Sequence, residues 1–285
     1  MAANNEPLSV RDLTKKYPAF ELRDITFDLV SGAITGFIGR NGAGKTTTLN
    51  SLLGFIRPDG GEVSFFGLDM KTSAEEIKQR IGFVSAGMTY YTGKKLKVIT
   101  DVTRAFYPNW DDGTYRKYMS RFGLDESKTP AALSNGMKIK YALALALSHG
   151  ADLMLLDEPT SGLDPVSREE LIEIFLSLRD AGKTILFSTH ITSDLDKCAD
   201  RILFLQNGRL TADRTLENFR TQYLLAEIQG ELPEAVKALA KGVCRVRDGY
   251  SALLQADDGK AAGIPCRAAT LDEIMVHLDK EEAAQ

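Results

Sequence analysis

The stretch from Gly39 to Thr46 constrains this chain more than any other, because it has the spacing G-x-x-x-x-G-K-T of a phosphate-binding loop. An apolar, β-prone run precedes it at residues 33–38, and residues 47–53 predict a helix. Glycines let backbone N–H groups surround phosphate oxygens, and the helix N-terminus directs its dipole at the same anion. The sequence therefore predicts a strand, loop and helix that bind a nucleoside triphosphate.

The side chains of this loop indicate how the triphosphate is bound. Lys45 can reach the β- and γ-phosphates, and the Thr46 hydroxyl can coordinate Mg²⁺. The expected nucleotide-binding residues of the loop are Gly39, Arg40, Asn41, Gly42, Ala43, Gly44, Lys45, Thr46 and Thr47. The alternative is a glycine-rich turn that matches by chance, and the strand before it and the helix after it disfavour that alternative.

Charge and cysteine content exclude some other functions. The net charge of −4 and the pI of about 5.6 argue against a nucleic-acid partner, which usually requires a basic surface. The 3 cysteines are few and widely spaced, which favours a reducing compartment over a disulfide framework or a zinc site. Residues 1–11 do not resemble a signal peptide, and the longest apolar run, 141–147, is far short of the roughly 20 residues of a membrane span. We therefore expect a cytosolic chain whose membrane role comes through a partner.

Apolar runs that alternate with helical segments predict an α/β fold with a mostly parallel sheet. The expected strands are 8–10, 26–29, 61–66, 80–84, 153–156, 184–187 and 201–205. Asn207-Gly208 predicts a hairpin turn. Helical spacing from about 90 to 148 predicts an inserted helical subdomain. The expected organisation is one domain over 1–218 and a small C-terminal α+β segment over 219–285, ending in an amphipathic helix at 271–278.

Two further motifs carry chemistry. The apolar run 153–156 ends in Asp157 and Glu158, and in phosphate-loop proteins such a strand brings its aspartate near Mg²⁺. We expect Asp157 to bind the metal and Glu158 to polarise the attacking water; a buried strand with a polar end is the alternative. In the second motif, Ser134 is a candidate N-cap and Gly136 permits close backbone approach at a helix N-terminus suited to a phosphate. An ordinary capped helix is the simpler interpretation of the second motif alone.

The order of these motifs resembles that of the nucleotide-binding subunit of an ATP-binding-cassette (ABC) transporter. The phosphate loop, residues 133–137, Asp157-Glu158, residues 161–164 and Thr189-His190 follow the family's order and approximate spacing. The resemblance spans roughly residues 8–213. It implies a phosphate-loop ATPase of the cassette type, with a mixed sheet and an inserted helical subdomain.

The resemblance also implies roles for individual residues. Tyr17 matches the aromatic residue that stacks on adenine, and its alternative is an exposed aromatic before Pro18. His190 matches the switch histidine that holds the γ-phosphate and the attacking water, so that Lys45, Glu158 and His190 form the expected catalytic set. The residues matching the signature that reaches the nucleotide of an opposite subunit are Ser134, Asn135, Gly136 and Met137. Asp164 matches the loop that joins the two sites.

Two positions depart from the family pattern. Ala86 stands where the family usually has Gln, and an alanine side chain can neither coordinate Mg²⁺ nor orient water. Metal ligation then rests on Thr46, Asp157 and water, and hydrolysis is expected to be slower. Asn135 and Met137 replace the commoner Gly and Gln of the signature, whereas Ser134 and Gly136 are kept.

The resemblance implies two kinds of protein partner. Two cassettes, as a homodimer or a pair of related subunits, close on ATP, and residues 86–110 contact an integral membrane permease at the cytoplasmic face of the membrane. Residues 106–111, Phe-Tyr-Pro-Asn-Trp-Asp, look similar to a bacterial subgroup paired with ABC-2 type permeases, often in efflux or antimicrobial resistance, which favours export. The aromatic residues expected at this interface, with Lys94, Lys95 and Lys97 nearby, are Tyr90, Tyr91, Phe106, Tyr107 and Trp110; the alternative is that they pack the helical lobe.

There are two alternatives to a transporter subunit: a soluble ABC ATPase of translation or DNA maintenance, and an ATP-dependent regulatory module. A soluble ABC ATPase of translation normally carries two cassettes, whereas this chain has one phosphate loop. A DNA-maintenance ATPase inserts a long module between loop and signature, and the interval 46–133 is too short for one. An ATP-dependent regulatory module with weak hydrolysis stays open because of Ala86.

Overall fold

The computed structural model describes residues 6–85 and 92–283, with side chains described to residue 280. By its internal contacts the chain divides into two compact units. The first comprises 1–190 with 198–211, and the second comprises 191–197 with 212–285. Ala86, Tyr90 and Tyr91, which carry predictions made from the sequence, lie outside the described residues.

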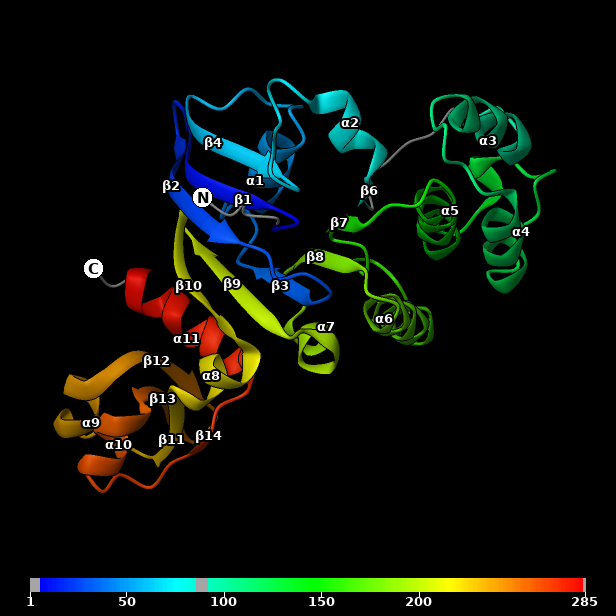
Figure 1. The fold of residues 1–285 in the computed structure, drawn as a ribbon. Helices are drawn as coiled ribbons and strands as arrows, with labels where there is room; N and C mark the ends of the chain where they lie inside the picture. Colours follow the sequence, from blue (N-terminus) through cyan, green and yellow to red (C-terminus); the bar gives the residue numbers. More distant parts are fainter. Residues whose placement is uncertain (1–5, 86–91, 284–285) are drawn as a thin grey trace. The chain divides into compact units, whose positions relative to one another are not determined.

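A six-stranded sheet, counted over the described residues, organises the first unit (Figure 1). Its order is β10-β9-β3-β8-β7-β6. The strands are β3 (Ile34–Ile38), β6 (Ile81–Ser85), β7 (Leu153–Asp157), β8 (Thr184–Thr189), β9 (Arg201–Gln206) and β10 (Arg209–Thr215). From β9 to β6 all neighbours pair in parallel, so the carboxyl ends of β3, β8 and β7 meet at one edge of the sheet. Every residue of these three strands is buried, as expected for strands covered on both faces.

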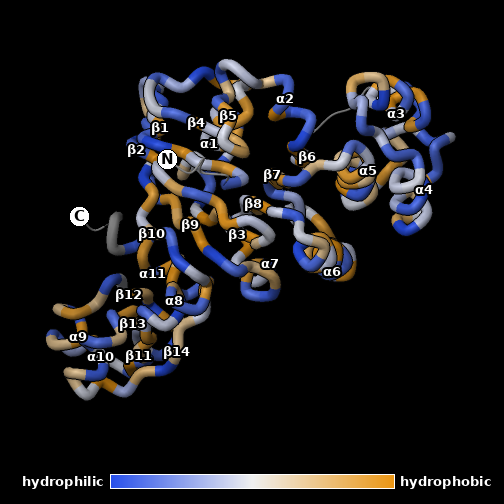
Figure 2. The backbone as a smooth tube through the Cα atoms, viewed as in Figure 1, coloured by the Kyte–Doolittle hydropathy of each residue, from blue (hydrophilic) through white to orange (hydrophobic). Residues whose placement is uncertain are grey.

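Helices cover this sheet at close range. They are α1 (Lys45–Leu52), α2 (Ala74–Gln79), α5 (Asn135–Ser148) and α6 (Pro165–Asp180). Gly82 of β6 lets α5 approach, because a Cβ atom there would lie 2.7 Å from the Cβ of Ala146. The second half of α5 is buried without a break from Tyr141 to Ser148, and Figure 2 shows the hydropathy of the helix residue by residue. The helix predicted at 47–53 begins two residues earlier in the structure, at Lys45.

A second, antiparallel sheet shares the core of this unit. Its order is β2-β1-β4-β5, from strands β1 (Ser9–Tyr17), β2 (Phe20–Asp28), β4 (Gly60–Phe65) and β5 (Leu68–Asp69). Leu13 and Phe27 pack in one buried cluster with Phe37 of β3, which fixes the first two strands beside the phosphate loop. The turn between β1 and β2 thereby reaches the loop.

The predicted helical lobe contains α3 (Leu96–Ala105), α4 (Asp112–Arg121), a short 3-10 helix (Pro130–Ala132) and α5. Its interior is tied by buried hydroxyls: Thr100 Oγ1 lies 2.9 Å from Tyr115 Oη and 2.8 Å from Tyr141 Oη. Burial raises the pKa of both phenols, so they stay neutral and hydrogen bonded. This network anchors α3 to the helix that begins with the signature.

The second unit is a split βαββαβ domain with flanking helices. Its sheet has the order β12-β13-β11-β14, and all of the pairs are antiparallel. Its elements are α7 (Thr192–Cys198), α8 (Leu216–Thr221), β11 (Tyr223–Gln229), α9 (Glu234–Leu239), β12 (Ala240–Val246), β13 (Gly249–Gln255), α10 (Ala256–Ala261), β14 (Arg267–Ala268) and α11 (Leu271–Ala283). Among the described residues, no helix combines the length and the apolar character that a membrane span needs.

Candidate functional site

Backbone geometry shapes the phosphate loop between β3 and α1. Gly44 has φ +113°, and a Cβ atom there would lie 2.7 Å from Cζ of Phe20. Glycine is therefore required at this position by conformation and by space. The side chain of Lys45 folds back along the loop, where Nζ donates to the carbonyl of Gly39 at 2.7 Å and to that of Arg40 at 3.2 Å. The N-cap residue of α1 is Gly44, which has no side chain to cap the helix, and this positive helix end suits an anion.

Two acidic residues at the end of β7 face this loop. Glu158 has φ +51°, a left-handed conformation that is uncommon for a residue other than glycine. Its carboxylate lies between two basic side chains: Oε1 is 3.3 Å from Nζ of Lys45, and Oε2 is 2.8 Å from Nδ1 of His190. The three side chains expected to be catalytic therefore meet at the adjoining ends of β3, β7 and β8.

Asp157 is buried behind Glu158 and contacts two hydroxyls. Thr46 Oγ1 lies 3.1 Å from Asp157 Oδ2, and Ser188 Oγ donates to Asp157 Oδ1 at 2.6 Å. Hydroxyl and carboxylate oxygens are ligands that Mg²⁺ accepts when it accompanies a nucleotide. The donor set of Thr46 and Asp157 therefore fits a magnesium ion. Sequence reasoning missed Ser188, although a lone hydroxyl after the apolar run Ile185 to Phe187 was a usable signal.

A cavity of about 670 Å³ opens over these groups. It is lined by Ala19, Phe20, Arg40, Asn41, Gly42, Gly44, Lys45, Thr46, Thr47, Glu158, Ser161 and His190. The structure thus brings together most of the loop residues predicted to bind nucleotide. On the side of the β1–β2 turn the wall is formed by Ala19 and Phe20, whereas the 41% exposed Tyr17 lies at the end of β1 with Lys15 Nζ 5.6 Å from its ring.

The predicted signature lies at the start of α5, apart from this cavity. Ser134 caps the helix, because its Oγ accepts from the backbone N–H of Met137 at 3.2 Å. Gly136 is buried against the start of α6 and the loop before it. A Cβ atom at Gly136 would stand 3.7 Å from side-chain atoms of Leu163 and Ser167 of the same chain. The cavity is lined only by other segments of the described chain.

Asp164 caps α6 in the same way. Its Oδ1 accepts from the N–H groups of Val166 and Ser167 at 3.1 Å, and the Ser167 hydroxyl donates to Oδ2 at 2.6 Å. These hydrogen bonds, led by that from the Ser167 hydroxyl, hold the pKa of the Asp164 carboxyl below its usual value. Ser134 and Asp164 therefore both have a capping role within one chain.

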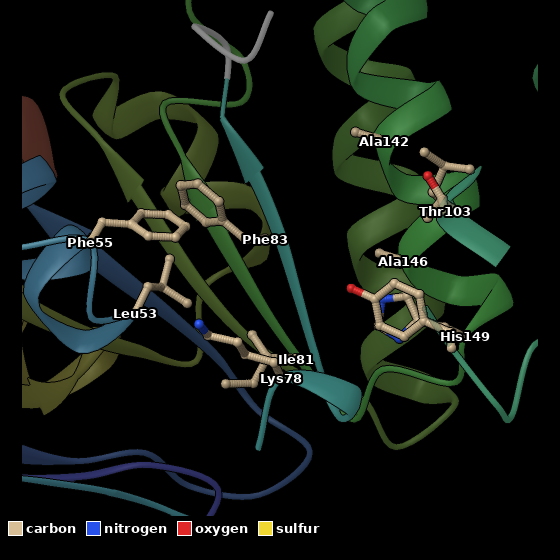
Figure 3. Close-up of a pocket in the computed structure, with 11 residues that line it drawn as sticks. Leu53, Phe55, Lys78, Ile81, Phe83, Thr103, Ala142, Ala146 and His149 are labelled. Atoms are coloured by element: carbon tan, nitrogen blue, oxygen red, sulfur yellow. The ribbon is translucent and has the colours of Figure 1, made fainter. Parts of the chain in front are cut away.

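A separate groove of about 310 Å³ lies between the sheet and the helical lobe (Figure 3). Phe55, Ile81 and Phe83 face Ala142 and Ala146 of α5 across it. The rings of Phe55 and Phe83 meet edge to face at 5.8 Å, yet Phe55 is 63% exposed. The groove thus leaves an aromatic side chain exposed at its surface.

The predicted interface aromatics have different environments. Phe106, at the end of α3, is 70% exposed. Tyr107 instead stacks on His149 with ring centroids 3.9 Å apart, and Trp110 Nε1 donates to Asp112 at 2.9 Å. Burial lowers the pKa of His149, which favours its neutral ring in this stack. Tyr107 and Trp110 therefore pack the helical lobe, whereas the side chain of Phe106 is exposed.

Comparison with known proteins decides the family. Residues 22–161 match the ABC transporter family. The chain is 30% identical over 219 residues to the ABC transporter ATP-binding protein YtrB of Bacillus subtilis, which covers 76% of this chain and 75% of YtrB. The chain belongs to the ABC transporter ATP-binding proteins. The cassette resemblance seen in the order of its motifs is thereby confirmed, and the chain is an ATP-binding subunit and an ATPase.

Two further relatives agree with this assignment. The bacitracin transport ATP-binding protein BcrA of Bacillus licheniformis is 31% identical, over 75% of this chain and 71% of its own length. A solved structure described as the ATP-binding subunit of an ABC transporter is 30% identical with a TM-score of 0.69, over 75% of this chain and 92% of that one. The predicted α/β cassette fold is confirmed. ABC transporter ATP-binding subunits pair with membrane permease components.

Proposed function

We propose that this ATPase powers its permease by closing on a second cassette around two Mg²⁺–ATP molecules. One observation carries the proposal: Lys45, Glu158 and His190 meet in the cavity of the phosphate loop, while the signature lies outside that cavity. A complete ATP site then needs Ser134 and Gly136 from a second subunit. Asp164, beside the signature glycine, stands in the loop between the two sites.

Each side chain of the cavity has a definite role in this proposal. Lys45 binds the β- and γ-phosphates, while Thr46 and Asp157 hold Mg²⁺, which neutralises phosphate charge when bound. Glu158 accepts a hydrogen bond from the attacking water, and His190 holds that water and the γ-phosphate. Phe20, in the strand after the β1–β2 turn, forms part of the cavity wall. Tyr17 lies just before the same turn, and its ring is proposed to stack on adenine at the edge of the cavity.

Dimer closure can be tested with a trapped state. Glu158→Gln is expected to bind Mg²⁺–ATP, to turn over slowly and to elute as a dimer in size-exclusion chromatography with light scattering. The same variant with ADP should remain a monomer. A monomer in saturating Mg²⁺–ATP, with nucleotide binding shown by fluorescence, would contradict the proposed closure.

The permease contact is proposed for the groove and the adjoining face of α3. Val98, Val102 and Phe106 are spaced four residues apart and are 46%, 53% and 70% exposed, so they form one apolar stripe on the helix. Exposed Lys94, Lys95 and Lys97 flank it. Exposed apolar side chains rimmed by charges are typical of a protein interface. This contact would hold the subunit at the cytoplasmic face of the membrane.

Co-purification tests this interface. Phe106→Asp should lower the amount of permease that co-purifies from detergent-solubilised membranes, while ATP binding by the isolated subunit is retained. Val246→Asp is the matched control, because Val246 is an exposed apolar residue of the other unit. Equal recovery of permease with both variants would contradict the interface.

Export is the proposed direction of transport. It is supported by the similarity of residues 106–111 to subunits that work with ABC-2 type permeases. The name of BcrA, which associates that relative with bacitracin transport, is consistent with antimicrobial resistance. Transport of a labelled candidate compound into inverted membrane vesicles on addition of ATP tests the direction.

We propose an accessory role for residues 219–285. The segment has its own buried cluster, in which Ala226, Val236 and Leu254 pack between the sheet and its helices. Within the second unit, Thr192 Oγ1 of α7 donates to Asp272 at 3.3 Å, and Arg220 lies 3.7 Å from Asp196. Deleting the segment from residue 219 would therefore remove Asp272 and Arg220, which contact α7, the helix that follows His190.

A further inference from the structure

Ser188 is a buried hydroxyl in the middle of the ATP site's supporting structure. It lies on β8, two residues before His190, and its side chain is fully buried. In the parallel pairing of β7 and β8, Ser188 stands directly beside Asp157. A buried hydroxyl must be hydrogen bonded to be tolerated, and the position on β8 offers it two partners.

The Ser188 hydroxyl uses both its donor and its acceptor capacity. It donates to Asp157 Oδ1 at 2.6 Å and accepts from the backbone N–H of Glu158 at 3.2 Å. Thr46 Oγ1 lies 3.1 Å from Oδ2 and 3.4 Å from Oδ1, so Oδ2, which the Ser188 hydroxyl leaves open, is the nearer oxygen. The hydroxyl thus holds the carboxylate in an orientation that brings Oδ2 toward the proposed metal ligand Thr46.

Ser188 also holds the backbone of Glu158. The N–H of Glu158 is bound both by the Ser188 hydroxyl and, at 3.0 Å, by the Ser188 carbonyl. These hydrogen bonds stabilise an unfavourable backbone conformation: Glu158 has φ +51°, which costs free energy and persists only where neighbouring groups impose it. This turn directs the Glu158 carboxylate between Lys45 and His190.

We propose that Ser188 is a positioning residue for ATP hydrolysis, fixing the rotamer of Asp157 for Mg²⁺ and the backbone of Glu158 for the attacking water. The inference rests on the proposed function of Thr46 and Asp157 as magnesium ligands. It goes beyond that function because it assigns to one hydroxyl, outside the cavity, the positioning of the Asp157 carboxylate and of the Glu158 backbone. An alanine would fill nearly the same space but would leave Asp157 Oδ1 without this donor.

The test measures how much Mg²⁺ strengthens binding of a fluorescent ATP analogue, by titration in Mg²⁺ and in EDTA. For Ser188→Ala we expect this gain in affinity to fall about tenfold, as for loss of one buried hydrogen bond to a charged group. Affinity in EDTA should be unchanged. Ser188→Thr keeps a hydroxyl on a β-branched side chain suited to a strand and should restore the gain. Ser148→Ala, which removes a buried hydroxyl from the end of α5, is the control and should behave like wild type.

Ser188→Cys gives the same information if the alanine variant does not fold, since a thiol is a weak donor. The inference is overturned if the folded variant, alanine or cysteine, keeps the full Mg²⁺-dependent gain. Thr46→Ala distinguishes a failure of the proposed magnesium site from a failure of the proposed role of Ser188. If Thr46→Ala also keeps the gain, the magnesium site itself is wrong; if only Thr46→Ala loses it, the role of Ser188 alone is wrong.

Discussion

His190 Nδ1 lies 2.8 Å from Oε2 of Glu158, and the other oxygen of the same carboxylate lies 3.3 Å from Lys45 Nζ. One carboxylate therefore connects His190, which follows β8, with Lys45 of the loop after β3. This contact joins three adjacent strand ends into a single site.

Replacing Glu158 by Gln should uncouple binding from hydrolysis. The amide has nearly the shape of the carboxylate but cannot act as a base, so we expect kcat to fall by about 10² to 10⁴. Affinity for ATP should be kept or increased, because repulsion between the carboxylate and the γ-phosphate is removed. Steady-state ATPase assays with nucleotide titrations measure both. Glu170→Gln, an exposed residue paired with Lys140, is the control, and near-normal turnover by Glu158→Gln would defeat the assignment.

Gly136→Ala should separate folding from turnover. A Cβ atom at Gly136 would make only ordinary contacts, at 3.7 Å, within its own chain. Alanine is also about 1 kcal/mol better than glycine in a helix, so thermal stability should be unchanged or slightly higher. If this glycine meets a phosphate of the opposite subunit, however, the added methyl group should reduce ATPase activity at least tenfold. Full activity with an unchanged melting temperature would remove Gly136 from the composite site.

The sequence pattern predicted which residues lie at the ends of the strands that form this cavity. The phosphate loop, Asp157, Glu158 and His190 are each tied to the end of an apolar run, and the parallel sheet brings those ends together. The sequence shows a hydroxyl at Ser188 after an apolar run, but its two hydrogen-bond partners could not be read from the pattern, because they depend on the register of β7 against β8. The strands predicted at 8–10 and 26–29 were too short for a different reason. Charged residues and irregular pairing with positive φ, at Asp12 and Asp24, interrupt the β alternation of β1 and β2.

Ala86→Gln tests the departure from the family pattern. A glutamine at this position would supply the side-chain oxygen that alanine lacks. We therefore expect half-maximal ATPase activity at a lower Mg²⁺ concentration, and a faster rate of hydrolysis. The measurement is ATPase rate against Mg²⁺ concentration at saturating ATP. Ala86→Leu adds comparable bulk without an oxygen and is the control. Unchanged Mg²⁺ dependence and rate in Ala86→Gln would show that the missing ligand is irrelevant here.

Asp164 should contribute to stability through its cap, in a pH-dependent way. Its folded pKa is depressed by the Ser167 hydroxyl and nearby N–H groups, so its stabilisation is present above the unfolded pKa and is lost as pH falls through the folded value. At neutral pH we expect the melting temperature to decrease in the order wild type, Asp164→Asn, Asp164→Ala, since Asn still caps a helix. In acid the wild type should approach Asp164→Asn. A constant difference between these two at all pH values would contradict the ionic contribution.

The C-terminal unit should lose stability in acid through Glu273. Arg267 binds both oxygens of Glu273, at 2.9 and 2.6 Å, and lowers the pKa of its carboxyl to about 2. A depressed folded pKa means that the stabilisation is complete above the ordinary value of 4.5 and disappears as pH falls toward 2. We expect Glu273→Gln to destabilise this unit by about 1 kcal/mol at pH 7, because Arg267 is half exposed and water screens the ion pair. Hydrogen exchange of the β11 and β13 amides at pH 7 measures the loss. Glu227→Gln, which removes the more exposed partner of Arg267, should cost less, and an equal effect of the two substitutions would contradict the dominant role of Glu273.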